Sequence, residues 1–322
     1  MPRSEKQKLK LLYLKQFLEE KTDLDHGVTN PQICQYLIDN GVNAERKSIY
    51  TDLDALEDFG LEIERGKDYR LTDRTFELKE VKMIIDSVAS SKFLSESASE
   101  TMVKKLGTLV SEHQRKDLRR QIRVMGRAKT MNNSALNAVD HIHSAISANT
   151  TIKFKYFHYN VKLEREYTRK GELYEVSPWA LLYDNDNYYL LAFVDGDFRT
   201  FRVDRMASIS QGTNERQGTE EFGKMDIAAY SKSTFSMFSG KEEKVDMIFQ
   251  NRMMDVVVDK FGKDIWLTKL DDDHFSVSVN VAVSPQFYAW VFGLGNYVTI
   301  TGPDHVVKGM KDMLEKVSKH YE

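Results

Sequence analysis

The sequence predicts an α+β multidomain protein, and three observations support this fold class. Residues 1–75 carry three amphipathic helical segments followed by two short strands. Residues 76–130 continue with helical apolar stripes. Residues 150–210 contain five short β-rich runs that are divided by turn signals, with no helix between them. A chain of 322 residues is long enough for two or three domains of ordinary size.

The first two helices are predicted from apolar spacing and capping residues. The first carries apolar side chains at helical spacing: Leu9, Leu12, Tyr13, Phe17 and Leu18. The second begins at Pro31, after Thr29 and Asn30 as capping residues, and ends at Gly41. Its apolar residues are Ile33, Tyr36, Leu37 and Ile38.

The third helix is predicted in AERKSIYTDLDALEDFG, where Ile49, Leu53, Leu56 and Phe59 recur every three or four residues. Toward its end the polar face is acidic, with Asp54, Glu57 and Asp58. Only the N-terminal half, which is basic and rich in hydrogen-bonding groups, is suited to phosphate. This polarity matches a recognition helix that enters a major groove by its N-terminal end.

A basic-tipped hairpin is predicted after Gly60, because LEIERGKDYRL reads as two strands around Gly66-Lys67-Asp68. Three helices and a hairpin favour a winged helix-turn-helix, although a small domain with an accidental charge gradient has the same pattern. The net charge of the chain is −3, so any DNA contact has to be local. The expected DNA-binding residues are Arg46, Lys47, Ser48, Tyr50, Thr51, Arg65 and Lys67.

The segment 76–130 is predicted to be a helical linker. Its stripes comprise Val81, Ile84, Ile85 and Val88, then Met102, Val103, Leu106, Leu109 and Val110. One slim linker is not expected to bury both stripes alone, which favours a homodimer. Residues 103–129 are strongly basic, and they could form either a solvated helix face or a phosphate contact.

The strand-rich region predicts a small β-barrel with the preceding helix, NSALNAVDHIHSAISAN, covering one end. In the strand FRTFRVDRM, Arg202 and Asp204 would share one face, and Phe201 and Val203 the other. Two interpretations remain. Arg202 and Asp204 could pair with neighbouring strands on a wet surface, or the arginines, with tyrosines of the strands, could line an anion-binding pocket. The candidate ligand-binding residues are Tyr156, His158, Ser177, Tyr189, Arg199, Arg202 and Arg205.

The run RKSIYTDLDALEDFGLEIERGKDYRL is similar to the end of the winged helix-turn-helix that heads bacterial WYL-domain transcriptional regulators. The matching positions are Ser48, Asp52, Leu53, Leu56 and Gly60. Tyr188-Tyr189-Leu190 resembles the family's Trp-Tyr-Leu triplet, with Tyr188 in place of Trp, and FRTFRVDRM resembles its arginine-rich strand. The region VAVSPQFYAWVFGLGNYVTITGP, with its closing helix, resembles the family's C-terminal extension.

This resemblance implies an Sm-like barrel that senses a nucleotide or nucleic-acid ligand, and an α/β extension after it. The expected domains are the winged helix-turn-helix at 1–75, the helical linker at 76–130, the WYL domain at 131–215, a connector at 216–240 and the C-terminal extension at 241–322.

The function expected from these features is that of a ligand-responsive, DNA-binding transcriptional regulator. Its partners would be a double-stranded DNA operator, an anionic nucleotide or oligonucleotide effector, and a second copy in a homodimer. The alternative is an accessory factor that binds single-stranded DNA or RNA through the barrel. We expect no enzymatic activity, cofactor or metal site. We also expect no membrane segment and a cytoplasmic location, because we find no signal-peptide cleavage site and no long apolar run.

Overall fold

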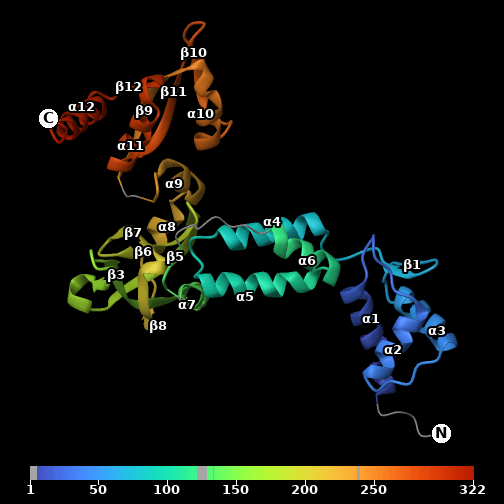
Figure 1. The fold of residues 1–322 in the computed structure, drawn as a ribbon. Coiled ribbons are helices and arrows are strands. Elements are labelled where there is room, and N and C mark those ends of the chain that lie inside the picture. The colour runs from blue at the N-terminus through green and yellow to red at the C-terminus, as the bar shows by residue number, and fades with distance from the viewer. Residues whose placement is uncertain (1–5, 122–128, 133, 238–239) are drawn as a thin grey trace. The chain divides into compact units, whose positions relative to one another are not determined.

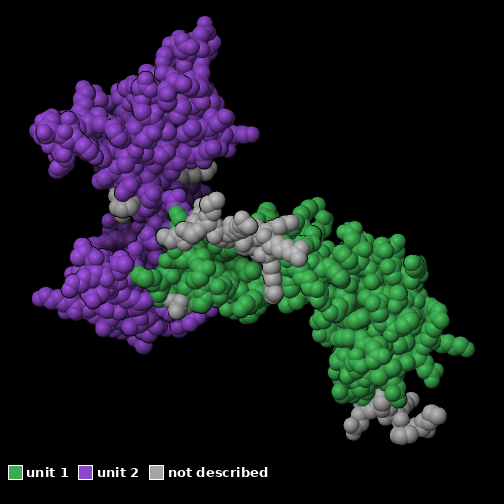
Figure 2. Space-filling view, viewed as in Figure 1, with its two compact units in different colours: residues 1–133 green, residues 134–322 purple. Residues whose placement is uncertain are grey.

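The computed structural model describes residues 6–121, 129–132, 134–237 and 240–322. These residues form two compact units, one spanning 1–133 and the other 134–322 (Figure 2). Each unit is described separately below.

The first unit begins with three helices and a two-stranded hairpin, in the order that the sequence predicts (Figure 1). The elements are α1 (Lys10–Lys21), α2 (Asn30–Asp39), α3 (Arg46–Asp58), β1 (Ile63–Arg65) and β2 (Tyr69–Leu71). Thr29 and Gln32 form a capping box at the start of α2. Gly41, with a φ of 75°, lies just past its end in the left-handed conformation that favours glycine. The three helices and the hairpin share one apolar core, which includes Leu14, Ile33, Ile49, Leu53 and Tyr69.

Some apolar residues were predicted on the wrong side of these helices. Leu14 of α1, which was not predicted, is fully buried like the predicted Leu18, whereas Leu9 and Leu12 are 41% and 63% exposed. Ile38 and Phe59, which were placed on apolar faces, are also exposed. Phe59 follows the last residue of α3, so the helical spacing no longer directs it toward the core.

Three further helices follow in the first unit: α4 (Leu78–Ser90), α5 (Glu96–Leu106) and α6 (Glu112–Gln121). Val81, Ile85, Val110 and Leu118 form a buried cluster, against which Val103 and Leu106 pack. Val81, Ile85 and Val110 of the predicted stripes are therefore buried among these helices, Leu109 is exposed, and the others are half-buried. The homodimer stays a prediction. Of the basic segment 103–129, residues 122–128 lie outside the described residues.

The second unit begins with helix α7 (Ala135–Ser147) and a six-stranded antiparallel sheet. The strands are β3 (Thr150–Tyr159), β4 (Arg165–Tyr167), β5 (Tyr174–Asp184), β6 (Asn187–Val194), β7 (Asp197–Arg202) and β8 (Met206–Glu215). Strand β3 pairs with β5 and β4, and also with β8. No pairing between β7 and β8 is found in these described strands, so the sheet is a curled half-barrel where a small β-barrel was predicted.

The arginine-rich segment is not one strand. Strand β7 ends at Arg202, and residues 203–205 form a 3₁₀ turn that leads into β8. The predicted alternation of side chains therefore stops at Arg202. Val203 and Asp204 are both buried, although they are neighbours in the chain.

Short helices α8 (Thr219–Gly223) and α9 (Ile227–Ser233) follow the sheet, and Phe222, Ile227 and Tyr230 pack against its Leu182, Tyr189 and Leu191. The rest of the chain has the β-α-β-β-α-β order of a ferredoxin-like fold, with one extra helix. Its elements are β9 (Lys241–Gln250), α10 (Met254–Phe261), β10 (Trp266–Lys269), β11 (His274–Val283), α11 (Pro285–Gly293), β12 (Val298–Gly302) and α12 (Asp304–Ser318).

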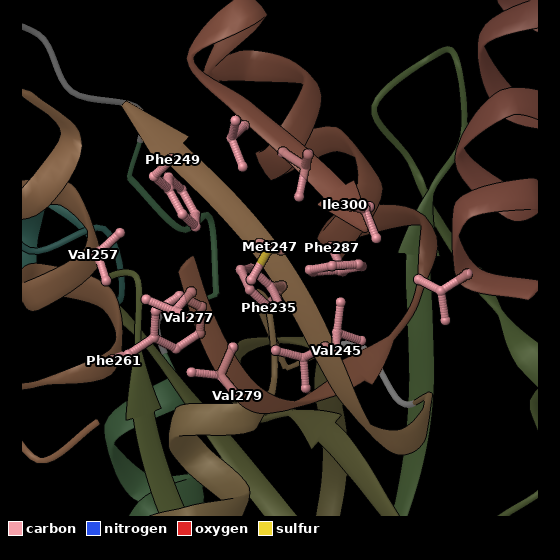
Figure 3. Packing of buried hydrophobic residues seen from close by; sticks show 14 of the residues in the cluster. Phe235, Val245, Met247, Phe249, Val257, Phe261, Val277, Val279, Phe287 and Ile300 are labelled. Carbon is pink, nitrogen blue, oxygen red and sulfur yellow. The ribbon is translucent and has the colours of Figure 1, made fainter. Parts of the chain in front are cut away.

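The C-terminal sheet has the strand order β10-β11-β9-β12 and supports the largest apolar cluster described in the second unit. Figure 3 shows Val245, Met247 and Phe249 of β9 beside Val277 and Val279 of β11, with Phe287 of α11 packed against them. Among the described residues of the whole chain, no helix is long and apolar enough to cross a membrane.

Candidate nucleic-acid interface

The exposed face of α3 carries four of the predicted DNA-binding residues. Arg46, Lys47, Tyr50 and Thr51 are all exposed. Tyr50 follows Arg46 by four residues, and Thr51 follows Lys47 by four residues. Residues four apart lie on the same side of a helix, so all four share one side. The opposite side carries Ile49 and Leu53, which are fully buried. Burial of the apolar side thus turns the basic and hydroxyl groups outward.

Ser48 and Arg65, two other predicted residues, are engaged inside the domain. The Ser48 hydroxyl accepts a hydrogen bond from the buried Lys10 ammonium at 2.7 Å and donates one to the Glu45 carbonyl at 2.8 Å. The Arg65 guanidinium binds both Glu57 carboxylate oxygens, at 3.0 and 2.6 Å, and contacts Asp54 at 2.7 Å. Both residues therefore already use the groups that were expected to contact DNA.

The hairpin is joined to helix α3 through tyrosines as well. Hydrogen bonds from Tyr69 and Arg46 hold the pKa of Tyr50 below its usual value. Burial, followed by the hydrogen bond with Tyr50, raises the pKa of Tyr69. Lys67 is exposed at the hairpin tip. Tyr69 thus links strand β2 to helix α3 close to the hairpin tip, where Lys67 is exposed.

In the second unit, Arg202 is the centre of a charged cluster. Its guanidinium binds both Asp204 carboxylate oxygens, at 3.0 and 2.9 Å, and donates to the Asn187 side chain at 2.7 Å. Burial lowers the pKa of Arg202, but the hydrogen bonds to Asp204 outweigh this effect and leave the pKa above its usual value. Asp204 is only 5% exposed. Arg202 and Asp204 therefore pair with each other, and the burial of Asp204 does not fit the interpretation in which both pair with neighbouring strands on a wet surface.

The other two arginines differ in their surroundings. The Nε atom of Arg205 lies 3.9 Å from Asp204, and its guanidinium lies 4.7 Å from the centre of the Tyr159 ring. Arg199 lies 3.6 Å from Asp195, at the β6–β7 turn. Asp195 therefore partly neutralises Arg199. Arg202 and Arg205 share Asp204, and Arg199 lies apart from them.

The four remaining candidate ligand-binding residues are not gathered at one place. The Tyr156 hydroxyl accepts the backbone N–H of Arg202 at 3.1 Å, and Tyr189 pairs with Arg202 across β6 and β7. Ser177 is buried, and its hydroxyl accepts the backbone N–H of Gln217 at 2.9 Å. His158 is exposed and lies 3.6 Å from Glu166.

Tyr156, Tyr189, Arg202 and Arg205 therefore surround Asp204, while Ser177, His158 and Arg199 do not. Asn187, a partner of Arg202, was not among the predicted residues. Predicting this contact requires the register in which β6 pairs with β7. Chemically, the cluster offers one partly neutralised cation, Arg205, beside a carboxylate that Arg202 already satisfies. Among the described residues, no group of three or more His, Cys, Asp or Glu side chains could hold a metal ion.

Comparison with known proteins identifies two domains. Residues 137–211 match the WYL domain, and residues 241–318 match the WCX domain. The chain is similar to proteasome accessory factor B/C (PafBC) of Arthrobacter aurescens, with 17% identity and a TM-score of 0.30 over all of this chain. This chain spans about half, 50%, of the length of that protein. It is also similar to a CRISPR Cas-related protein, with 12% identity, a TM-score of 0.39 and coverage of 77% of this chain and 75% of the other. A search of curated proteins found no match.

Proposed function

We propose that this protein is a DNA-binding transcriptional regulator that reads duplex DNA through α3 and the β1–β2 hairpin. The observation that carries the proposal is the outward face of Arg46, Lys47, Tyr50 and Thr51, beside a hairpin with Lys67 at its tip. Cations at the start of a helix contact phosphates and base edges, and the helix dipole favours phosphate there. The WYL domain, which the resemblance stated above associates with regulators of this kind, supports the same function.

The acidic end of α3 is compatible with this role because Arg65 neutralises it. Asp54 and Glu57 would otherwise repel the phosphate backbone. The guanidinium of Arg65 binds both carboxylates, so the repulsion near the hairpin is reduced. We therefore assign the DNA contact to Arg46, Lys47, Tyr50, Thr51 and Lys67, and give Arg65 an internal role.

The proposal includes two further parts. The region around Arg205 senses an anionic nucleotide or oligonucleotide, because its guanidinium is less completely neutralised than that of Arg202. The protein acts as a homodimer, because one recognition helix reads only half of a two-fold operator.

A binding selection followed by mobility-shift titration tests the DNA-binding function. Fragments bound from random duplex DNA define the operator, and affinity is then measured at several salt concentrations. Lys47→Ala should weaken binding to all sequences and reduce the salt slope by about 1, whereas Arg46→Ala should cost about 1–3 kcal/mol and relax base preference. Lys263→Ala, which removes an exposed lysine after α10, is the control and should change neither. Unchanged affinity in the Arg46→Ala/Lys47→Ala double variant would contradict the assignment of α3.

A single-stranded nucleic-acid binder is the second candidate. Its support is a set of cations beside aromatic rings of the β3–β4 ribbon: Lys155 with Tyr167, Arg165 with Phe157, and Arg205 of the 203–205 turn with Tyr159. Positive charge beside aromatic rings suits an unpaired strand. If this candidate is correct, Arg165→Ala should weaken binding to a single-stranded oligonucleotide, and the double variant of α3 should leave that binding unchanged.

A further inference from the structure

An apolar hollow opens on the surface of the WCX domain, between α11, β12 and α12. Its volume is about 450 Å³, which lies within the range of small-molecule sites. Aliphatic and aromatic side chains form most of its lining: Val291, Phe292, Ile300, Val307, Met310 and Leu314. Part of this lining faces solvent, since Phe292 is 59% and Leu314 41% exposed. Exposed apolar surface that surrounds a concavity is typical of a binding site.

The polar groups of the hollow are few and have one sign of charge. Among the described residues that line it, Lys311 is the charged one. Thr299 also borders the hollow, but it is exposed between the buried Val298 and Ile300, so its side chain lies on the other face of β12. Neighbouring lysines of α12 are neutralised within the helix, because Lys308 pairs with Asp312 and Lys319 with Glu315, both at 2.8 Å. Lys311 has no ion-pair partner in the described part of the chain. The hollow therefore combines an apolar wall with an unneutralised cation.

We propose that this hollow binds a small amphipathic carboxylate, such as a medium-chain fatty acid. The apolar chain of the ligand would cover Phe292, Ile300 and Leu314, and its carboxylate would meet the Lys311 ammonium. An ammonium on a flexible stem binds a carboxylate as a compact point charge, and partial burial strengthens that attraction. This site lies in the WCX domain and is separate from the arginines of the WYL domain, so the proposal stands whether or not the chain binds DNA.

Calorimetric titration of the full chain with decanoate tests the proposal. Saturable binding of one decanoate per chain is expected. Lys311→Gln should weaken it about tenfold, the size of one charge-assisted hydrogen bond. The matched control is Lys308→Gln on the same helix, which removes an exposed lysine outside the hollow and should leave affinity unchanged. 1-Decanol should bind the wild type more weakly than decanoate does, and should bind Lys311→Gln and the wild type equally.

A second variant tests the role of the apolar wall. Leu314→Glu places a carboxylate at a partly exposed position of the wall, so the fold should persist, as a thermal unfolding curve would verify, while decanoate binding is lost. Absence of saturable binding to the wild type, or equal binding by the wild type, Lys311→Gln and Leu314→Glu, would overturn the proposal. Sedimentation would identify the remaining occupant. If Leu314→Glu converts a dimer to a monomer and decanoate does not bind, the hollow is an interface between copies and the proposal is wrong.

Discussion

Arg65 lies on strand β1, but its guanidinium contacts the acidic end of helix α3. Its side chain is 29% exposed, and it forms charged hydrogen bonds with Glu57 and an ion pair with Asp54. Burial lowers the pKa of Arg65, but its hydrogen bonds with Asp54 and Glu57 outweigh this effect and leave the pKa above its usual value. One side chain thus fixes the hairpin to the helix and reduces the negative charge beside the proposed DNA contact.

Replacing Arg65 should affect stability more than phosphate contact. Arg65→Ala should lower the free energy of unfolding by about 1 kcal/mol, since partly exposed ion pairs contribute at most this much. Arg65→Lys should lose most of the same amount, because an ammonium cannot reproduce the two-pronged contact with Glu57. Urea unfolding of the full chain measures both effects. The salt slope of DNA binding should match that of the wild type in both variants, and a slope reduced by about 1 in Arg65→Ala would show that Arg65 contacts phosphate directly.

At the scale of elements, periodicity and capping predicted the helices well. Which side of a helix is buried and where a strand ends depend on contacts between elements, and these were not predicted. Leu12 and Leu14 fit a helix equally, and only the packing of α1 against its neighbours decides that Leu14 is buried. The end of β7 at Arg202 could not be read from the sequence either, because alternation continues through Val203 while the chain turns. For the same reason the partner of Arg199 was missed: Asp195 approaches it through the β6–β7 turn.

The start of α6 is joined to the α1–α2 loop by buried hydrogen bonds. Asp23 is 2% exposed and accepts hydrogen bonds from the Ser111 hydroxyl, His26 and the backbone N–H of Asp25. Burial raises the pKa of Asp23, but these hydrogen bonds outweigh burial and leave the pKa below its usual value. Beside it, Lys21 and Lys116 lower the pKa of Glu112 to about 2.

Because the pKa values of Asp23 and Glu112 are lowered, we expect the contact between the α1–α2 loop and the start of α6 to weaken in acid. A group whose pKa is lower in the folded state stabilises the fold above its unfolded pKa, about 3.9 for Asp and 4.3 for Glu. That contribution is lost as the pH falls through the folded pKa, which for Glu112 is about 2. Ser111→Ala should cost about 1–3 kcal/mol at pH 7, because it removes a helix cap and a hydrogen bond to a buried carboxylate.

The pH dependence of that loss distinguishes the two roles of Ser111. The difference between Ser111→Ala and the wild type should narrow below about pH 4, where Asp23 becomes protonated in the unfolded state and the linkage contribution fades. Urea unfolding between pH 7 and pH 3 measures it. Ser87→Ala, which removes a hydroxyl that bonds only a helical carbonyl of α4, should give a difference that does not depend on pH. A constant difference for Ser111→Ala as well would mean that Ser111 acts as a cap alone.

At the scale of the whole molecule, the proposed DNA contact and the proposed effector site belong to different compact units. An effector can change DNA affinity only if it binds more tightly to the DNA-competent arrangement of the chain, or less tightly. Tight binding of the effector, or a well-formed pocket for it, is therefore not sufficient to change DNA affinity. Thermodynamic linkage also requires that DNA change the effector's affinity by the same factor.

Reciprocity gives the sharpest test of regulation. A cyclic dinucleotide and a short single-stranded oligonucleotide serve as probes, and we expect one of them to change operator affinity about 5- to 150-fold, the usual range of coupling between sites. Operator DNA should change the affinity of that probe by an equal factor in calorimetry. Arg205→Gln should abolish both effects and leave DNA binding without the probe unchanged. This variant is preferable to Arg202→Ala because Arg202 makes the two-pronged contact with the buried Asp204, so its loss would also weaken the fold. A probe that changes operator affinity but binds the wild type and Arg205→Gln equally would place effector recognition elsewhere than at Asp204 and its arginines.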